Sequence, residues 1–139
     1  MKDTVFEDDD FCFACGELNP LGLHLSFGRE GDSLVTSFVG SEHLQGYRGI
    51  LHGGIIVTVL DDLMSNAVAR IHGKLAVTAS LSAKFKNPVR VGTRLFGRSR
   101  VQQVRGRYFK CLAELREEAS GMLVATAEAL LVSVEQTPP

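Results

Sequence analysis

Residues 55–71 read IIVTVLDDLMSNAVARI, and this segment decides the fold. Its apolar residues recur at the i, i+3/i+4, i+7 spacing of an α-helix with a wide buried face. Gly73 is placed to end this helix, because glycine readily adopts the left-handed conformation of a helix C-terminus. The apolar positions are Ile56, Leu60, Leu63, Met64, Ala67, Val68 and Ile71.

The chain after this helix alternates between apolar and polar residues with the two-residue period of β-strands. From Val77 to Phe85 the odd-numbered residues are apolar and the even-numbered ones polar, so the two sets are expected on opposite faces of one strand. Asn87-Pro88 ends that strand. Turn residues at Arg105-Gly106 and Ala119-Ser120-Gly121 separate three further strands. We predict these strands at residues 93–104, 108–117 and 122–134.

The chain before the helix predicts a hairpin. Residues 11–22 are rich in turn formers, and the alternating stretches Leu23–Phe27 and Leu34–Phe38 are expected as strands around a turn at Gly28–Asp32. The order is therefore two strands, one helix and four strands. Because one helix has only the sheet to bury its face against, we predict an α+β fold in which a curved antiparallel sheet wraps around one long central helix. The alanine-rich face of the last strand is small enough for the helix to approach closely.

Composition predicts one domain over residues 1–139, with a turn-rich segment at 1–22 and a tail at 135–139. Hydrophobic residues make up 45% of the chain and charged residues 22%, as in ordinary globular proteins. The beginning of the chain does not resemble a secretory signal, and charged residues interrupt the apolar stretch 50–71, so we expect no membrane span. Three cysteines, an odd number, are read as reduced thiols, which favours the cytoplasm.

Residues 46–54 lead into the helix with the sequence GYRGILHGG. Gly53 and Gly54 permit close approach of another group to the backbone, and no Ser, Thr, Asp or Asn caps this end. The first-turn N–H groups are therefore expected to lack a side-chain partner. Together with the positive end of the helix dipole, they suit a partly negative oxygen, as in an oxyanion hole. The alternative is that the glycines only let the chain enter the helix.

Two consecutive acids lie on the helix and have different expected roles. Asp61 lies at the edge of the apolar stripe, with Thr58 and Ser65 beside it, where partial desolvation suits a base or a nucleophile. Asp62 lies near the middle of the polar face, so we predict that it is a surface charge. The alternative is that both acids only solvate the helix.

Several motifs together resemble the hotdog-fold acyl-CoA thioesterases, in particular the phenylacetic-acid-degradation (PaaI-like) type of the 4HBT superfamily. The central motif is His-Gly-Gly followed, after six residues, by Asp. The resemblance covers nearly the whole chain. The matching residues are His52-Gly53-Gly54 with Asp61, Cys12-Phe13-Ala14-Cys15-Gly16, Asn19-Pro20-Leu21-Gly22-Leu23, Gln45-Gly46 and Pro88.

The resemblance implies hydrolysis of an acyl- or aryl-CoA thioester without a cofactor. It implies that the Gly53 amide polarises the thioester carbonyl, while Asp61, supplied across a dimer interface, activates water or attacks directly. Thr78 matches a hydroxyl residue that assists the water. Some relatives have an asparagine six residues before the histidine, where this chain has Gly46, and the neighbouring Gln45 is expected to supply the amide. The expected catalytic set is Asp61, Gly53, Gly54, Thr78, Gln45 and His52.

Nine basic residues and no acidic one lie from Lys84 to Lys110. Coenzyme A carries a 3′-phosphate and a pyrophosphate, so a basic sheet edge would bind its nucleotide end, and we expect Lys84, Lys86 and Arg90 as contacts. Nucleic acid is the rival partner, but few aromatics interleave with the charges and no nucleic-acid motif is present, so we expect none. About half of the nine basic residues are expected only to solvate outer faces.

Cys12 and Cys15 form a Cys-x-x-Cys pair. A structural zinc site needs four ligands and the next cysteine is Cys111, so we expect no metal. A redox role is not expected either, because the pair does not lie between a strand and a helix of a βαβ unit.

We expect a homo-oligomer, because a single sheet around one helix leaves an unpaired strand edge and half of a pocket. A dimer is the minimum, and a dimer of dimers is the expected larger assembly. Two other functions stay open. One is a non-catalytic acyl-CoA sensor on the same fold. The other is a hydratase, which needs a histidine paired with the acid, whereas His52 lies nine residues from Asp61.

Overall fold

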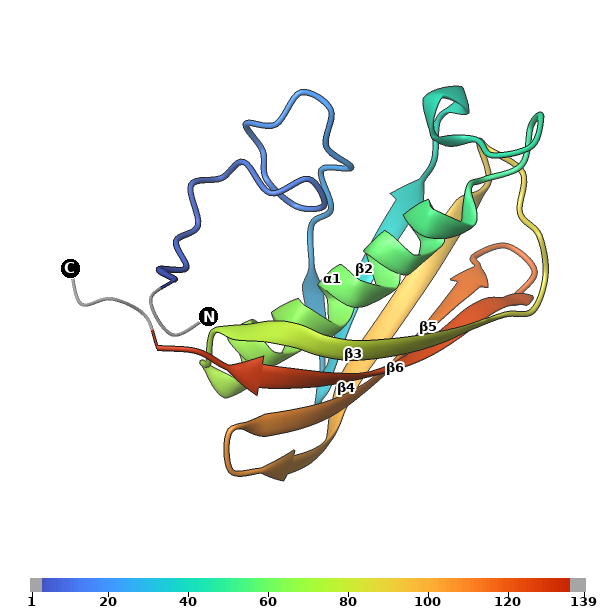
Figure 1. Cartoon of the computed structure of the whole chain (residues 1–139). Coiled ribbons are helices and arrows are strands. Elements are labelled where there is room, and N and C mark those ends of the chain that lie inside the picture. Colours follow the sequence, from blue (N-terminus) through green and yellow to red (C-terminus); the bar gives the residue numbers. More distant parts are fainter. Residues whose placement is uncertain (1–3, 136–139) are drawn as a thin grey trace.

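The computed structural model describes residues 4–135, so most of the predicted tail, residues 136–139, lies outside the described residues. The described residues form one long helix and six strands (Figure 1). In chain order these elements are β1 (Gly28–Glu30), β2 (Ser33–Val39), the short 3-10 helix η1 (Glu42–Leu44), α1 (Gly53–His72), β3 (Ala76–Phe85), β4 (Arg94–Arg105), β5 (Tyr108–Glu117) and β6 (Leu123–Ser133).

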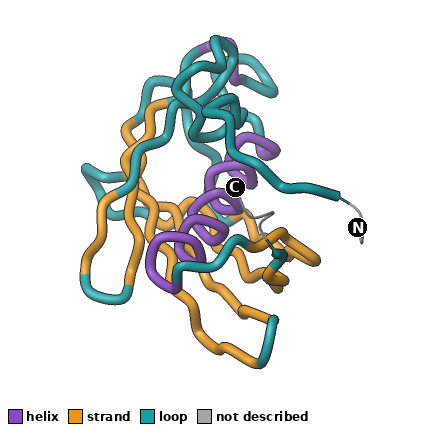
Figure 2. The backbone as a smooth tube through the Cα atoms, turned by 90° about the vertical axis from the view of Figure 1, so that its left-hand side faces the viewer, coloured by secondary structure: helices purple, strands orange, loops and turns teal. Residues whose placement is uncertain are grey.

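The strands form one antiparallel sheet in the order β1-β2-β4-β5-β6-β3. The sheet curves around α1, and a view turned by 90° shows the helix lying against the strands (Figure 2). The predicted architecture is therefore confirmed. Because β3 pairs only with β6, its other side is an open edge of ten residues among the described part of the chain. No helix of residues 4–135 is long and apolar enough to cross a membrane.

The core lies between α1 and the inner face of the sheet. Val59, Leu60, Leu63 and Met64 of the helix are each 0% exposed. The small face predicted for β6 is confirmed, since its alanines at 125, 127 and 129 are buried. The helix also approaches β4 closely, because a Cβ atom added at Gly97 would lie 2.6 Å from Cδ1 of Leu63.

The C-terminal end of α1 agrees with the prediction, whereas the N-terminal end does not. Gly73 has a φ of 66° and ends the helix, as predicted. The expectation of an uncapped N-terminus is wrong, because His52 is the N-cap residue and its Nδ1 accepts a hydrogen bond of 2.8 Å from the Gly54 amide. An imidazole nitrogen thus takes the place of the hydroxyl or carboxylate oxygen that usually caps a helix.

The strand predicted at Leu23–Phe27 is wrong, although the hairpin exists. His24 has a φ of 56°, which breaks an extended strand, and its ring bonds the Asn19 carbonyl at 2.8 Å. The Leu25 amide bonds the Ala14 carbonyl instead of a neighbouring strand. The first strand therefore begins only at Gly28.

The strict alternation predicted for Val77 to Phe85 is also wrong. Thr78 pairs with Leu131 and Ser80 with Leu130, so Ala79 is an extra residue that forms a β-bulge. A bulge shifts the following side chains to the opposite face of a strand. Thr78 therefore faces α1 together with Leu81 and Ala83, which pack against the core, instead of opposite to them.

The helix and the other predicted strands are observed within two residues of their expected ends. The turn predicted at Gly28–Asp32 is wrong in its first part, because Gly28–Glu30 forms β1 and only residues 31 and 32 lie between the strands. One cluster of buried side chains joins the N-terminal loop, the helix and the sheet. The division of residues 1–139 into a single domain stays a prediction.

Candidate functional site

The N-terminus of α1 offers one free backbone donor. The Gly54 amide bonds His52 Nδ1, and the amides of Ile55 and Ile56 bond the His52 carbonyl at 3.0 and 3.2 Å. The Gly53 amide has no hydrogen-bond partner within residues 4–135. Because helix N-termini attract negative charge, this N–H is suited to bind a partly negative oxygen.

A cavity of about 620 Å³ lies beside this helix end. Its walls combine the helix entrance with the end of β3 and the segment that follows it. A Cβ atom added at Gly53 would lie 3.4 Å from Cε1 of the Phe85 ring, so the aromatic ring lies directly against the helix tip. A mostly apolar cavity with a few polar groups is the usual form of a small-molecule site. Residues that line it include Gly46, His52, Gly53, Ile56, Phe85 and Lys86.

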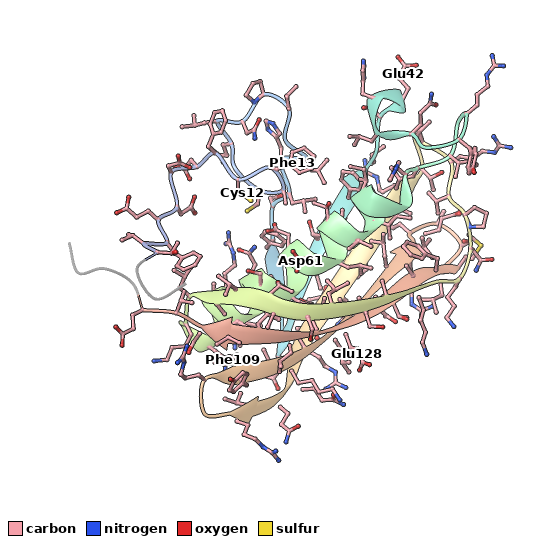
Figure 3. All side chains as sticks on the ribbon, in the orientation of Figure 1. Cys12, Phe13, Glu42, Asp61, Phe109 and Glu128 are labelled. Carbon is pink, nitrogen blue, oxygen red and sulfur yellow. The ribbon has the colours of Figure 1, made fainter. Side chains whose placement is uncertain are left out.

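Asp61 lies near the middle of α1, half-buried, where Figure 3 labels it. Thr78 Oγ1 donates a hydrogen bond of 2.6 Å to Asp61 Oδ1, across from β3 to the helix. The bulge at Ala79 makes this contact, because it turns Thr78 toward the helix. Thr58, expected beside Asp61, instead donates to the Gly54 carbonyl at 2.9 Å. The structure thus brings Asp61 and Thr78 together and fixes the carboxylate.

The helix tip and the carboxylate do not meet within one chain. Gly53 and Asp61 are eight residues apart on α1, which corresponds to ~12 Å along the axis. The cavity beside Gly53 is lined by neither Asp61 nor Thr78. A single chain therefore contains two half-sites, one with the backbone donor and one with the carboxylate.

Gln45 was expected to supply a side-chain amide at the site, but it is not among the residues that line the cavity. Its Oε1 accepts a hydrogen bond of 2.9 Å from the Gly49 amide and so holds the loop that leads into α1. The residue that lines the cavity is the neighbouring Gly46, whose amide bonds the Ile50 carbonyl at 2.8 Å. In this conformation Gln45 shapes the entrance loop.

The three expected CoA contacts are divided between two places. Lys86 lines the cavity, and Arg90 is exposed and forms a β-bridge with Ile50, close to the helix entrance. Lys84 instead lines a separate hollow of about 510 Å³ on the outer face of the sheet, together with Arg98. Arg98 is paired with Glu30 at 2.7 Å, so a carboxylate from β1 neutralises part of the basic run.

Asp62 is not the surface charge that the helical pattern predicts. The N-terminal loop covers it, and Cys15 Sγ lies 3.8 Å from its Oδ1. Burial raises the pKa of Asp62 to about 6. Burial also raises the pKa of the Cys15 thiol to about 12, and the Asp62 carboxylate adds to this rise. The prediction is wrong because a helical wheel does not include a loop that packs over the polar face.

Residues 48–124 match the family model of the thioesterase superfamily. The chain belongs to the thioesterase superfamily. The matched range of this superfamily member contains both half-sites, since it includes Gly53, Asp61 and Thr78.

Known relatives agree with this membership. The mouse protein "Acyl-coenzyme A thioesterase THEM4" is 30% identical over 107 residues, which cover 76% of this chain and 45% of that protein. The chain spans about half the length of the THEM4 relatives it matches.

Solved structures of the superfamily confirm the hotdog fold. The thioesterase superfamily protein RHA08564 has a TM-score of 0.81 at 26% identity, over 88% of this chain and 60% of that chain. A phenylacetic acid degradation-related protein from Ralstonia eutropha JMP134 has a TM-score of 0.71 at 26% identity, over 81% of this chain and 86% of that chain.

Proposed function

We propose that this chain hydrolyses the thioester of an acyl- or aryl-coenzyme A. The observation that carries the proposal is the Gly53 amide, which has no hydrogen-bond partner among residues 4–135 and lies at a helix N-terminus beside a cavity of about 620 Å³. The names of the THEM4 relatives and membership of the thioesterase superfamily support the same reaction. No cofactor is needed for it.

In the proposed reaction the Gly53 N–H binds the thioester oxygen and stabilises the negative charge that develops on it. Asp61 either takes a proton from water, whose oxygen attacks the carbonyl carbon, or attacks that carbon itself to give an anhydride that water then hydrolyses. The C–S bond breaks, and the coenzyme A sulfur leaves as a thiol. Thr78 holds Asp61 through the hydrogen bond at 2.6 Å. The Gly54 amide is bonded to His52, so we assign these two residues to shaping the helix tip.

We propose that two chains complete each site by pairing their β3 edges. Thr78 lies near one end of β3 and contacts Asp61, whereas Phe85 lies at the other end against Gly53. Antiparallel pairing of two β3 strands about a two-fold axis exchanges these ends. Asp61 of one chain then faces the Gly53 amide of its partner, and two equivalent sites form. A dimer of two such dimers stays a prediction.

The nucleotide end of coenzyme A is proposed to bind near Lys86 and Arg90, which lie beside the helix entrance. Charge-assisted hydrogen bonds from these side chains suit its phosphates. Lys84 lies on the outer face of the sheet, so it contacts these phosphates only if a neighbouring chain holds the ligand against that face.

All three cysteines are free thiols, which suits the reducing compartment predicted from the sequence, and the cytoplasm stays our prediction for the location.

The experiment compares Gly53→Pro with Gly53→Ala on a panel of acyl- and aryl-CoA substrates. Proline removes the N–H and is tolerated at the first position of a helix, and the extended backbone of His52, with ψ of 134°, suits a residue before proline. Alanine keeps the N–H, and its Cβ fits at 3.4 Å from the Phe85 ring. We expect kcat/KM to fall by about 10²–10³-fold in Gly53→Pro and to stay within about tenfold of wild type in Gly53→Ala.

Equal rates for the two folded variants contradict the assignment of Gly53. If the wild-type protein binds acyl-CoAs saturably and hydrolyses none over hours, the result contradicts the proposed enzymatic function and favours a non-catalytic sensor. Circular dichroism and thermal unfolding of each variant establish that the fold is kept.

A further inference from the structure

The N-terminal loop and α1 bring three metal-binding side chains together outside the proposed active site. Sγ of Cys12, Sγ of Cys15 and a carboxylate oxygen of Asp62 all lie within 4.8 Å of one another. Two of these groups come from the loop and one from the helix. Figure 3 labels Cys12 in the loop and Asp61, the residue before Asp62, on the helix.

One oxygen of this cluster lacks a partner. Asp62 Oδ2 is buried and has no hydrogen bond within residues 4–135, whereas Oδ1 has only the weak donor Cys15 Sγ at 3.8 Å. Burial of a carboxylate oxygen without a donor or a cation costs free energy, so such atoms are rare. The carboxylate therefore points into a place that a cation would stabilise.

The loop is built so that the two sulfurs meet. The Gly16 amide bonds the Cys12 carbonyl at 2.9 Å and closes a tight turn. A Cβ atom at Gly16 would lie 2.3 Å from the Cys12 nitrogen and 2.6 Å from the Asp10 oxygen, so this turn excludes any larger residue. The Leu23 and Leu25 amides bond loop carbonyls and hold the turn against the rest of the chain.

We propose that Cys12, Cys15 and Asp62 bind one zinc ion, which ties the N-terminal loop to α1, with water as the fourth ligand. Two thiolates and a carboxylate are ligands that zinc accepts and that magnesium and calcium do not prefer. Tetrahedral zinc with Zn–S bonds of ~2.3 Å places its sulfurs about 3.8 Å apart. The ligand atoms already lie within 4.8 Å of one another, so no pair of them has to move closer by more than about 1 Å. Each thiol gives up its proton as it binds.

The proposed zinc ion joins the loop to the helix and takes no part in the thioester reaction, although its water ligand leaves one position open. Asp62 faces the loop, whereas Asp61 bonds Thr78 on the flank of the helix toward β3. A disulfide between Cys12 and Cys15 is the rival use of the two sulfurs. It would leave Asp62 Oδ2 without a partner, and for this reason the cluster favours a metal.

The test is a titration of the reduced, metal-free protein with Co²⁺, which reports thiolate ligands by a charge-transfer band and tetrahedral geometry by intense d–d bands. We expect both signals to saturate at one ion per chain, and Zn²⁺ to displace them. Cys15→Ser and Asp62→Asn are expected to weaken Zn²⁺ binding on the order of 100-fold or more, since even outer-shell changes cost 10–100-fold. Cys111→Ala is the matched control, because this third thiol is buried in the core away from the cluster.

Absence of a saturating charge-transfer band in wild type contradicts the proposal, whatever the variants do. The proposal is also contradicted if folded Asp62→Asn binds Co²⁺ with the same affinity as wild type, as judged by the charge-transfer band. A loss of Zn²⁺ binding in Cys111→Ala as large as that in Cys15→Ser contradicts it as well. A mass decrease of about 2 Da without bound metal in protein purified without reductant favours the disulfide. Zn²⁺ is further expected to raise the unfolding temperature of wild type and not that of Cys15→Ser. None of these readouts depends on turnover.

Discussion

Asp61 and Asp62 are consecutive residues of one helix, and they lie on two different flanks of it. The flank toward β3 holds Asp61, which takes one hydrogen bond of 2.6 Å from Thr78. The flank toward the N-terminal loop holds Asp62, which lies under Cys15 and has one buried oxygen without a hydrogen-bond partner in the part of the chain that the structure describes. One helical step of about 100° separates the carboxylate that we propose for catalysis from the carboxylate that we propose for a cation.

The neighbours of this helix, more than its own sequence pattern, decide the surroundings of its two acids. On the β3 flank a bulge at Ala79 supplies the partner hydroxyl. On the loop flank a tight turn closed at Gly16 supplies two sulfurs. Both features are local irregularities of the backbone, and each fixes the surroundings of one carboxylate.

The largest expected effect separates the two acids by turnover. Asp61→Asn should lower kcat with acyl-CoA by about 10²–10⁴-fold, because the amide keeps the acceptor for Thr78 but is neither base nor nucleophile. Asp62→Asn should lower kcat by less than tenfold, because its side chain faces the loop. Steady-state kinetics on the two purified variants measures both. Equal losses would remove the distinction between the flanks.

The next effect tests the loop flank through stability. Gly16→Ala should lower the free energy of unfolding by about 1–3 kcal/mol, because its Cβ would clash with backbone atoms 2.3 and 2.6 Å away. Gly28→Ala is the matched control, since its Cβ meets only a Val35 methyl group at 3.4 Å, and a change within about 1 kcal/mol is expected. Denaturant unfolding of both variants gives the comparison. A Gly16→Ala protein as stable as wild type would show that the turn is not tightly packed.

The smallest effect tests the β3 flank. Thr78→Val removes the hydroxyl that donates to Asp61 and should lower kcat/KM about tenfold, as expected for a hydrogen bond to a charged group worth about 1.5 kcal/mol. Thr78→Ser keeps the hydroxyl and should stay closer to wild type. If valine and serine reduce the rate equally, then the methyl group, and not the hydrogen bond, matters at this position.

The sequence predicts most of the fold for a simple physical reason. The apolar period of residues 55–71 and the two-residue period after it report burial directly, so α1, β4, β5 and β6 are observed close to their predicted ends. His24 with its positive φ and the bulge at Ala79 were missed, because each interrupts an alternation that is intact in the sequence.

The candidate site is predicted in part. The family motif identifies Gly53, Asp61 and Thr78, and the structure brings the last two together. The cap by His52 was missed, because histidine is not among the common capping residues. The cluster of Cys12, Cys15 and Asp62 was missed because Asp62 is 47 residues from Cys15 in the chain and meets the two cysteines only through loop packing. The Cys-x-x-Cys pair by itself supplies only two metal ligands, and the sequence gives no sign that Asp62 is the third.

We propose that each active site combines the Gly53 amide of one chain with Asp61 of another, and dimers of two different variants can test this. Chains carrying Gly53→Pro and chains carrying Asp61→Asn are co-expressed with different tags, and the heterodimer is isolated. One of its two sites then has both intact groups, so we expect roughly half of the wild-type turnover from two inactive parents. A heterodimer as inactive as both parent homodimers would contradict the shared site.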